Sequence, residues 1–472
     1  MDMQDAKQAL KKFFGYDSFR PMQEDIIADA MQGKDSLVLM PTGGGKSICY
    51  QIPAIISEGT CLVVSPLIAL MKDQVEGLRA NGVPAAYINS SLSFMEQQEV
   101  EGQVLQGKVK LLYVSPEKLL SQGFFNFMQA FTVSLIAIDE AHCISAWGHD
   151  FRPEYTQLKH LKAQFPQTPV MALTATADKA TRKDIVSQLQ LPDPRVYIAS
   201  FDRPNLTLTV VPGQKRIQRL MQFIERRPKE SGIVYCLSRR ETENVAAKLQ
   251  AKGINAGYYH AGLSSEERAK MQEDFIKDAI PIMSATIAFG MGIDKSNVRW
   301  IVHYNMPKNL EGYYQEIGRA GRDGLPSEAM LMYSYGDYAT LQRFAEESGQ
   351  AELQLAKLDR MKQFAEASIC RRRMLLSYFG EQLSEDCGNC DVCLNPPKRF
   401  DGTVLAQKAL SAVARLKQRV GVGMLIDVLR GSGRKEIFEM GYNQVKTYGA
   451  GRDISYFDWQ QLLWQMLNLG LL

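Results

Sequence analysis

A glycine-rich loop directly after an apolar run constrains the fold of this chain more than any other feature. The run is Leu37–Met40, and the loop Pro41–Ser47 reads Pro-Thr-Gly-Gly-Gly-Lys-Ser. Successive glycines let backbone N–H groups surround a phosphate, while Lys46 supplies a positive charge and Ser47 can ligate Mg²⁺ at a helix N-terminus. A strand must therefore end where a helix begins, which is typical of an α/β fold. The phosphate-binding candidates are Thr42, Gly43, Gly44, Gly45, Lys46 and Ser47.

The length of the chain, 472 residues, exceeds one ordinary core, and typical domain sizes predict about three domains. Apolar residues account for 45% of the chain and charged residues for 23%, which is the composition of a soluble globular protein. No apolar run approaches the length of a membrane span, and the N-terminal segment Met1–Lys7 lacks the apolar core of a signal peptide. We therefore expect a cytoplasmic protein without a membrane partner.

Short apolar runs alternate with helix-like segments through two successive parts of the chain. The expected strands are Leu37–Met40, Cys61–Ser65, Lys110–Val114, Leu135–Ile138 and Val170–Leu173, then Leu206–Val211, Ile233–Cys236, Gly257–His260, Pro281–Ser284, Trp300–Tyr304 and Ala329–Tyr333. Alternation of this kind is typical of parallel sheets covered by helices. The sequence therefore predicts two α/β domains in tandem.

After Tyr335 the strand pattern gives way to helical stretches, and Pro204 interrupts the chain between the two strand series. Three short helices are expected around Leu405–Val413, Met424–Leu429 and Trp459–Leu467, which suits a helix-turn-helix or winged-helix fold. We expect domain limits of 1–204, 205–336, 337–400 and 401–472.

Two carboxylates, Asp139 and Glu140, directly follow the apolar run Leu135–Ile138. Parallel sheets bind their ligands at this carboxyl edge. Asp139 suits Mg²⁺, and Glu140 can orient and deprotonate an attacking water. An isolated Asp-Glu pair is usually an ordinary surface pair, but the phosphate loop in the same domain favours the catalytic interpretation.

Two arginines three residues apart, Arg319 and Arg322, end the second strand-rich part. On one helical face they can reach a phosphate together. A guanidinium presented across a cleft stabilises the charge of a phosphoryl-transfer transition state. The alternative is that these arginines pair with Glu316 or Asp323.

Four cysteines form a cluster with the spacing C-x16-C-x2-C-x2-C, and they are Cys370, Cys387, Cys390 and Cys393. Four soft ligands in a reduced compartment suit a tetrahedral, structural Zn²⁺. An iron–sulfur cluster is the alternative, but the ferredoxin pattern needs a cysteine at 397, where this chain has Pro397. The run Arg371–Arg373 beside the cluster either contacts phosphates or pairs with acidic residues.

These residues, in this order, resemble the RecQ family of DNA helicases within superfamily 2. Further matching segments are Phe14–Glu24, Ser65–Leu67, Ala172–Thr176 and Ala288–Lys295. That family has the loop form Pro-Thr-Gly-x-Gly-Lys-Ser/Thr, so it accepts Met40, where a strict phosphate-loop pattern has glycine. The resemblance implies ATP as the nucleotide and two RecA-like domains followed by a zinc module and a winged-helix domain. It also implies that the adenine is held by Tyr16, Arg20 and Gln23.

An aromatic loop follows the two carboxylates, over Ile144–Tyr155, and mixes aromatic, charged and glycine residues. Bases stack on rings while arginine meets phosphate, so this composition suits a single strand, and the resemblance assigns the loop to coupling DNA binding with ATP hydrolysis. The alternative is that Trp147 and Phe151 pack a domain corner. The DNA-binding candidates are Trp147, His149, Phe151, Arg152 and Tyr155.

The resemblance implies 3′-to-5′ translocation on single-stranded DNA and unwinding of tailed duplexes in repair and recombination. It further suggests a monomer associated with the nucleoid, with a single-stranded-DNA-binding protein as a partner. Eleven Lys and Arg against six Asp and Glu in residues 398–472 favour DNA, although a solvated helical surface would look alike. The alternatives are an RNA helicase, a translocase that does not unwind, and a binding scaffold with an inactive ATP site.

The C-terminal end departs from the family pattern. A winged helix needs a β-hairpin after its third helix, and the sequence ends at Leu472, just past that helix. We therefore expect a partial winged-helix domain without its wing and without the further helical module of many RecQ proteins, as in a truncated chain.

Overall fold

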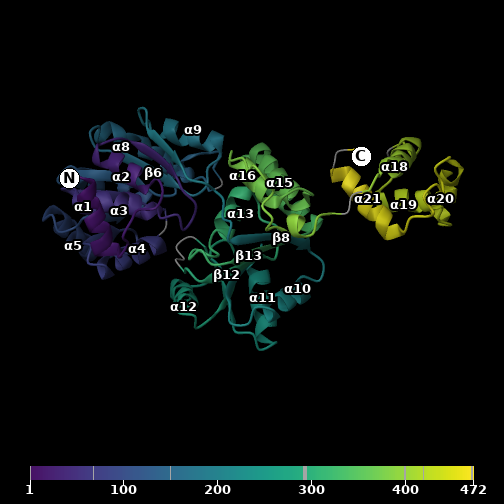
Figure 1. The fold of residues 1–472 in the computed structure, drawn as a ribbon, viewed down its shortest axis with the longest axis horizontal. Coiled ribbons are helices and arrows are strands. Elements are labelled where there is room, and N and C mark those ends of the chain that lie inside the picture. The colour runs from purple at the N-terminus through teal and green to yellow at the C-terminus, as the bar shows by residue number, and fades with distance from the viewer. Residues whose placement is uncertain are drawn as a thin grey trace. The chain divides into compact units, whose positions relative to one another are not determined.

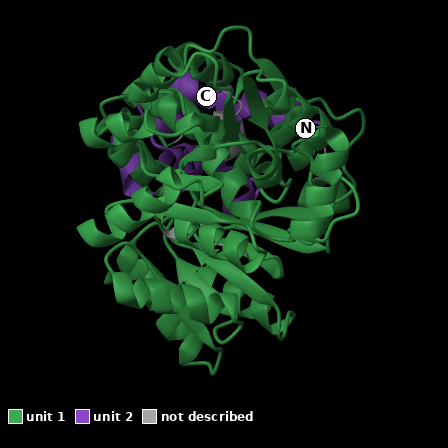
Figure 2. Ribbon diagram, turned by 90° about the vertical axis from the view of Figure 1, so that its left-hand side faces the viewer, with its two compact units in different colours: residues 1–395 green, residues 396–472 purple. Residues whose placement is uncertain are grey.

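The computed structural model describes residues 2–66, 68–148, 150–290, 295–397, 400–417, 419–468 and 471–472. His149, Leu67 and residues 291–294, which belong to the expected DNA-binding loop and to two of the family segments, lie outside the described residues. The chain divides into two compact units, residues 1–395 and 396–472 (Figures 1 and 2). No helix in the described part of the chain has both the length and the apolar character of a membrane span.

The first unit begins with a seven-stranded parallel sheet in the order β3-β4-β2-β5-β6-β1-β7. Its strands are β1 Ser36–Leu39, β2 Thr60–Val64, β3 Ala85–Ile88, β4 Leu111–Val114, β5 Val133–Ile138, β6 Val170–Thr174 and β7 Arg195–Ile198. Both faces are buried, because Leu37 and Leu39 pack into one apolar cluster while Val38 and Met40 pack into another. Helices must therefore cover both sides of the sheet.

The helices that accompany the first sheet include α3, which starts directly after the glycine loop. They are α1 Met3–Ala9, η1 Leu10–Phe14, α2 Gln23–Met31, α3 Lys46–Ile56, α4 Ile68–Ala80, α5 Phe94–Leu105, α6 Pro116–Leu119, α7 Gln122–Met128, η2 Ala141–Ile144, η3 Pro153–Leu158, α8 Lys159–Gln164 and α9 Lys179–Gln188. The cluster that contains Val38 takes residues of α2, α3 and α4, and the opposite cluster takes residues of α5, α7, α8 and α9. The loop after β1 thus has helices firmly packed on both sides.

The second sheet has six parallel strands in the order β10-β11-β9-β12-β13-β8. Its strands are β8 Leu206–Pro212, β9 Ser231–Tyr235, β10 Ala256–Tyr259, β11 Ile282–Ala285, β12 Val298–His303 and β13 Ser327–Tyr333. Its helices are α10 Arg216–Glu225, α11 Arg239–Gln250, α12 Ser265–Ile276 and α13 Leu310–Ile317. In Figure 1, α10 and α11 lie on one side of this sheet and α13 lies on the other, in agreement with the two apolar clusters.

Four helices with the clustered cysteines pack against the second sheet, on the side of α13 (Figure 1). They are α14 Tyr335–Glu346, α15 Ala351–Glu366, α16 Arg371–Tyr378 and α17 Asp391–Leu394. Cys390 forms a parallel bridge with Leu208 of the edge strand β8, and the carboxylate of Asp391 accepts a hydrogen bond from Val210 N at 3.2 Å. The cysteine segment therefore covers an edge whose backbone groups would otherwise be unpaired.

The second unit consists of α18 Thr403–Arg415, α19 Val422–Arg430, α20 Lys435–Glu439, η4 Tyr442–Gln444 and α21 Tyr456–Asn468 around its own apolar core. Its three expected helices are confirmed, and α20 is an additional one. Trp459 is fully buried at its centre and donates from Nε1 to the carbonyl of Gly451 at 2.9 Å.

The eleven strands expected from the sequence are confirmed, with limits that differ by at most two residues. Two strands of the first sheet, β3 and β7, were not expected. Both lie at its edges, and three of the four residues of β7 are exposed. The domain limits stay predictions.

Candidate functional site

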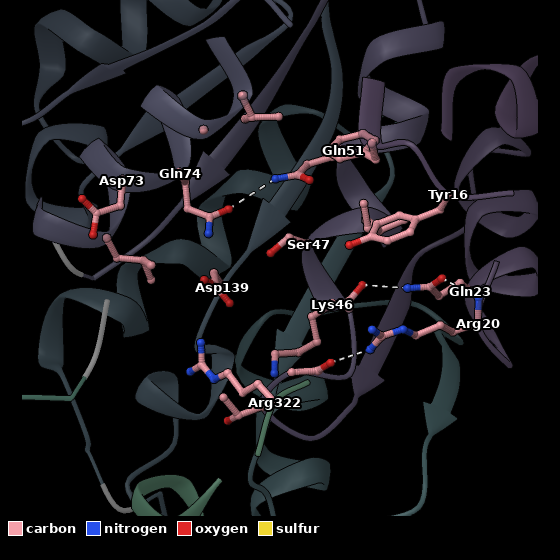
Figure 3. Close-up of a pocket in the computed structure, with 18 of the residues that line it drawn as sticks. Tyr16, Arg20, Gln23, Lys46, Ser47, Gln51, Asp73, Gln74, Asp139 and Arg322 are labelled. Carbon is pink, nitrogen blue, oxygen red and sulfur yellow. Dashed lines mark hydrogen bonds between the residues drawn. The ribbon is translucent and has the colours of Figure 1, made fainter. Parts of the chain in front are cut away.

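A cavity of about 480 Å³ lies at the carboxyl ends of β1 and β5, next to residues that follow α13 (Figure 3). The expected site residues on its walls are Tyr16, Arg20, Gln23, Thr42, Gly43, Gly45, Lys46, Ser47, Asp139, Glu140, Arg319 and Arg322. The structure thus brings together groups from both sheets. Gly44 belongs to the same loop, where its N–H donates to the carbonyl of Pro41 at 2.9 Å.

The glycines of the loop are required by its geometry. Gly45 has a φ of 87°, and a Cβ there would lie 2.4 Å from Nε2 of Gln23. Gly43 has a φ of 79°, and a Cβ there would lie 3.3 Å from the side chain of Arg322. No side chain caps the first turn of α3, which begins at Lys46. Its backbone N–H groups are therefore available to an anion.

The ammonium of Lys46 is held inside the loop by backbone oxygens. It donates to the carbonyls of Met40 at 2.9 Å and Pro41 at 3.4 Å. Burial lowers the pKa of Lys46, although the nearby carboxylates of Glu140 and Asp139 favour its charged form. A phosphate placed here would meet a preformed positive charge.

The carboxylate pair sits in a strained turn after β5. Glu140 has a φ of 48°, which is uncommon for a residue with a side chain, and its N–H donates to Oδ1 of Asp139 at 2.9 Å. Burial, and then the charge of Glu140, raise the pKa of Asp139 to about 7. A half-buried carboxylate pair beside the hydroxyl of Ser47 is the all-oxygen donor set that Mg²⁺ prefers, so the residues fit that ion.

Glu140 is also contacted by two side chains that accompany different sheets. Nδ1 of His142 lies 3.3 Å from Oε2 of Glu140 and 2.9 Å from Oγ1 of Thr174. Nε2 of Gln315 on α13 donates to Oε1 of Glu140 at 3.4 Å. The carboxylate of Glu140 is therefore oriented by groups that belong to both sheets.

The two expected arginines take different positions. Arg322 lies against the loop at Gly43 and lines the cavity drawn in Figure 3. Arg319 is buried, and its guanidinium donates to the carbonyl of Gly290. Arg319 thus fixes the segment after β11, while Arg322 lines the wall opposite the phosphate loop.

The acidic residues named as alternative partners of the arginines contact other groups. Glu316 lies 2.6 Å from Nε2 of His303, and Asp323 lies 2.6 Å from the guanidinium of Arg299. Because both carboxylates contact other groups, Arg322 is still interpreted as a residue of the cavity wall.

The adenine candidates flank the phosphate loop at the cavity rim. Arg20 donates from its guanidinium to the carbonyl of Gly43 at 2.5 Å. Gln23 accepts from the N–H of Arg20 at 2.8 Å and donates to the carbonyl of Gly45 at 3.0 Å, and Tyr16 is 55% exposed. An open ring beside a fixed amide suits stacking and edge recognition of a base.

The aromatic loop presents two exposed rings, since Trp147 is 52% and Phe151 37% exposed. Arg152 is half-buried, where it donates to the carbonyl of Pro66 at 3.0 Å and pairs with Asp150 at 3.3 Å. Exposed rings are available to bases, and Arg152 fixes the loop to the segment after β2.

Tyr155 differs from the expectation that it contacts DNA. Its ring is fully buried, and its hydroxyl donates to the carbonyl of Asp139 at 3.1 Å. A ring without an exposed face cannot stack on a base. Tyr155 instead connects the aromatic loop to the carboxylate pair.

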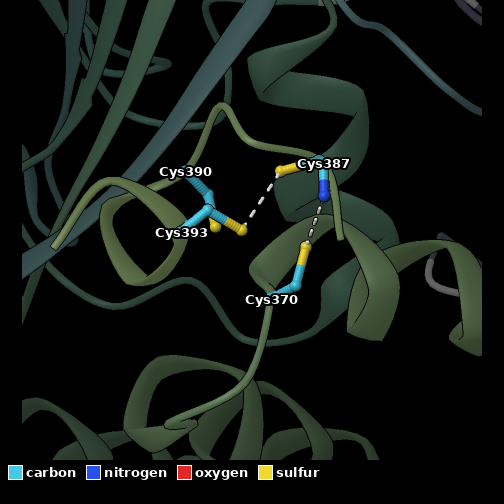
Figure 4. A group of neighbouring side chains, drawn as sticks. All are labelled: Cys370, Cys387, Cys390 and Cys393. Atoms are coloured by element: carbon cyan, nitrogen blue, oxygen red, sulfur yellow. Dashed lines mark hydrogen bonds between the residues drawn. The ribbon is translucent and has the colours of Figure 1, made fainter. Parts of the chain in front are cut away.

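The four clustered cysteines converge on one point (Figure 4), with all four sulfurs within 4.8 Å of one another. Sγ of Cys387 and Sγ of Cys393 are 3.9 Å apart. A tetrahedral Zn²⁺ with bonds of about 2.3 Å separates its ligand sulfurs by about 3.8 Å. The donor set and its spacing therefore fit zinc.

The run of three arginines beside this cluster pairs with acidic residues. Arg371 contacts Asp391 at 2.9 Å, Arg372 contacts Asp202 at 2.7 Å, and Arg373 contacts Asp386 at 3.0 Å. The structure therefore supports pairing of this run with acidic residues rather than contact with phosphates.

Sequence reasoning missed two contacts that join the cavity walls. Gln315 lies four residues before Arg319, but nothing in the sequence showed that it reaches Glu140. Arg203 directly precedes Pro204 between the two strand series, and its guanidinium donates to the carbonyls of Thr42 at 3.4 Å, Gly318 at 3.3 Å, Ala320 at 2.8 Å and Gly321 at 2.9 Å. A polar residue in a linker next to a proline was the signal available.

Four known domain families match successive parts of the chain. A DEAD/DEAH box helicase domain matches residues 20–185 and a helicase conserved C-terminal domain matches residues 215–324. A RecQ zinc-binding domain matches residues 335–394, and an RQC domain matches residues 396–472. The third match favours zinc over an iron–sulfur cluster.

Known proteins resemble the chain over nearly its whole length. It is 51% identical over 472 residues to the ATP-dependent DNA helicase RecQ of Pasteurella multocida, covering 99% of this chain and 75% of that protein. It is 50% identical over 468 residues to that of Haemophilus influenzae, covering 98% and 76%. The DNA-bound structure of the helicase MrfA has a TM-score of 0.59 at 18% identity, covering 81% of this chain and 59% of that one, and so shares the fold. The chain belongs to the RecQ family of ATP-dependent DNA helicases.

Proposed function

We propose that this protein hydrolyses ATP in the cavity between its two sheets and thereby moves 3′-to-5′ along single-stranded DNA and unwinds tailed duplexes in repair and recombination. The composition of the cavity wall supports the proposal most strongly, because Lys46 and Glu140 come from the first sheet and Arg322 follows α13 of the second. ATP that bridges these groups would draw the two sheets together, and hydrolysis would release them.

The cavity residues that were expected from the sequence each have a proposed role. The loop Thr42–Ser47 and its Lys46 bind the phosphates, Glu140 orients and deprotonates the attacking water, and Arg322 stabilises the charge on the transferred phosphoryl group. Ser47 and Asp139 would hold Mg²⁺, which neutralises phosphate charge when bound. The proposed roles of the remaining residues are adenine binding by Tyr16, Arg20 and Gln23, and orientation of the arginine segment by Arg319.

Single-stranded DNA is proposed to stack on Trp147 and Phe151, with Arg152 holding the loop in place. His149 stays a candidate from the sequence. The structure also supports contact between this loop and the site of hydrolysis, because Tyr155 bonds to the backbone of Asp139.

The proposed zinc site on Cys370, Cys387, Cys390 and Cys393 is structural, since four thiolates leave no open position. We further propose a monomer, because one chain supplies both walls of the cavity. A cytoplasmic, nucleoid-associated location and contact with a single-stranded-DNA-binding protein would follow from the proposed substrate.

The test of the motor function is the ATPase rate without nucleic acid, with single-stranded DNA and with RNA, measured beside unwinding of duplexes with 3′ or 5′ tails. We expect stimulation by DNA and unwinding from the 3′ tail, with Lys46→Ala as the control for contaminating ATPase. A rate that DNA leaves unchanged would contradict the motor function. Stimulation by RNA alone would identify an RNA helicase, and stimulation without unwinding would identify a translocase.

The test of the metal site is elemental analysis of the folded protein, followed by chelation. We expect one zinc per chain, and we expect its removal to release the segment around Cys390 from β8, because that segment covers the strand edge. Folded protein that contains no zinc, or that contains iron and sulfide, would overturn the assignment.

A further inference from the structure

One buried lysine joins three parts of the first unit. Lys357 lies on α15, and its ammonium donates to the carbonyl of Trp147 at 2.5 Å and to Oε1 of Glu311 at 2.7 Å. Trp147 belongs to the aromatic loop after β5, and Glu311 lies in the first turn of α13. The side chains of Lys357 and Glu311 are 6% and 3% exposed. A single ammonium thus connects a loop of the first sheet to a helix of the second.

Stability alone is a poor reason for this ion pair. Removing a lysine and a glutamate from water is costly, and a well-packed apolar pair of similar volume often stabilises a fold as much or more. A buried charge pair does, however, fix the register of the elements that carry it. The register fixed here is that of the loop backbone at Trp147 against α13.

Helix α13, which Lys357 contacts at Glu311, also contacts the carboxylate pair. Glu311 and Gln315 are four residues apart on α13, so they lie on one face of the helix. Gln315 donates to Oε1 of Glu140 at 3.4 Å. One turn of helix therefore separates the contact with the aromatic loop from the contact with the proposed catalytic carboxylate. The chain then continues from α13 to Arg322.

We propose that Lys357 is a positioning residue that transmits the state of the aromatic loop to Glu140 through α13. A strand that stacks on Trp147 displaces the loop backbone, and the ammonium passes this displacement to Glu311 and hence to Gln315. This inference rests on the proposed function, because it requires that single-stranded DNA stimulates ATP hydrolysis. The contacts of Lys357 with Trp147 and Glu311 are the physical link that the proposed coupling needs.

The test compares Lys357→Met, Lys357→Arg and Arg360→Met. Arg360 is an exposed cation on the same helix, hydrogen-bonded to Gln363, and it serves as the matched control. For Lys357→Met we expect a roughly tenfold loss of DNA-stimulated turnover, with DNA-free ATPase within about twofold and DNA affinity within about threefold of the wild type. Lys357→Arg keeps donors for both partners and should recover about half of the stimulation.

A second comparison separates positioning from simple stability. Glu311→Gln should lower the unfolding temperature, because it leaves the buried ammonium of Lys357 without its counter-charge. The double variant Lys357→Met/Glu311→Gln buries no charge, so the unfolding temperature should recover. The DNA stimulation should stay lost in the double variant, since the contact with Trp147 is still missing. Recovery of both properties would overturn the proposal and reduce Lys357 to one half of an ion pair.

The outcomes also separate this inference from the proposed function. If single-stranded DNA does not stimulate the wild-type ATPase, the proposed function fails. If DNA stimulates the wild type and Lys357→Met equally, the positioning role fails and the proposed function stands. If Lys357→Met loses DNA-free and DNA-stimulated turnover in the same proportion, the residue acts on folding or on chemistry in general, which also contradicts the proposal.

Discussion

Two strand–loop–helix junctions of the molecule begin their helices in different ways. After β1, α3 starts behind Gly45, which has a φ of 87° and offers no side-chain cap. After β9, α11 starts behind Ser238, whose hydroxyl accepts a hydrogen bond from the N–H of Glu241 at 3.2 Å. Both junctions belong to parallel sheets, but the first leaves its backbone donors to an anion, whereas the second satisfies one of them with a side chain of its own.

The second sheet contributes to the cavity by a different route. Its groups there are side chains on or after α13, namely Gln315, Arg319 and Arg322. Backbone donors and Lys46 on one wall suit the binding of phosphate, while a guanidinium on the opposite wall suits the stabilisation of a transition state. The difference teaches that similar folds can divide the work of one site, since the first wall carries the phosphate loop and Glu140 while the second stabilises the transferred charge.

The largest expected effect comes from Arg322→Ala. Hydrolysis should fall by about 10³–10⁵-fold, while ATP affinity stays within about threefold, because the arginine acts on transferred charge. Single-turnover hydrolysis and equilibrium nucleotide binding measure the two quantities. Arg219→Ala, which removes an exposed arginine of α10, is the control and should change neither. If Arg322→Ala loses as much ATP affinity as Lys46→Ala, both walls bind phosphate, and the proposed division between phosphate binding on one wall and charge stabilisation on the other is wrong.

A smaller effect is expected from Gly45→Ala. Backbone strain at a φ of 87° and a Cβ placed 2.4 Å from Gln23 should lower ATP affinity by about tenfold to a hundredfold. Gly33→Ala is the matched control, since its φ is 76° but a Cβ there has nothing within 4 Å. It should lower stability and leave ATP affinity unchanged. Equal losses of affinity in the two variants would mean that the loop geometry is not specific to the nucleotide.

The smallest effect is expected at the capped junction. Ser238→Ala removes the hydroxyl that caps α11, so the free energy of unfolding should fall by about 1 kcal/mol with no change in ATP affinity. Ser238→Thr keeps a capping hydroxyl and should retain most of the stability. Denaturant titration and nucleotide binding test both expectations, and a changed affinity would assign the second junction a part in nucleotide binding.

The sequence predicted the central strands of both sheets because each is a continuous apolar run buried on two faces. It did not predict β3 and β7, which lie at the edges of the first sheet. Ala85 and Ala86 supply little apolar signal, and Val196 and Ile198 of β7 are largely exposed. The edge strands β8 and β10 of the second sheet were predicted, so the weak apolar signal of β3 and the exposure of β7, rather than the edge position itself, explain why these two were missed.

The candidate site was predicted where a side chain has its own chemistry, as at Lys46 and Asp139. Contacts with backbone carbonyls were not predicted, because every residue carries a carbonyl and the sequence does not show which one is near. Three such hydrogen bonds run from Lys357 to the carbonyl of Trp147, from Arg203 to that of Thr42, and from Arg319 to that of Gly290. The burial of Tyr155 was missed for a related reason, since an aromatic ring suits a core as well as a base.

The central claim is that one chain supplies both walls of the ATP site. The most direct measurement mixes Lys46→Ala with Arg322→Ala and follows DNA-stimulated ATPase as the total protein concentration rises. Each variant keeps the residue that the other lacks. The account predicts no recovery of activity at any concentration, because the intact loop and the intact arginine are then on different molecules. Activity that grows with concentration would show that the arginine acts on the loop of a second chain, and would contradict the account.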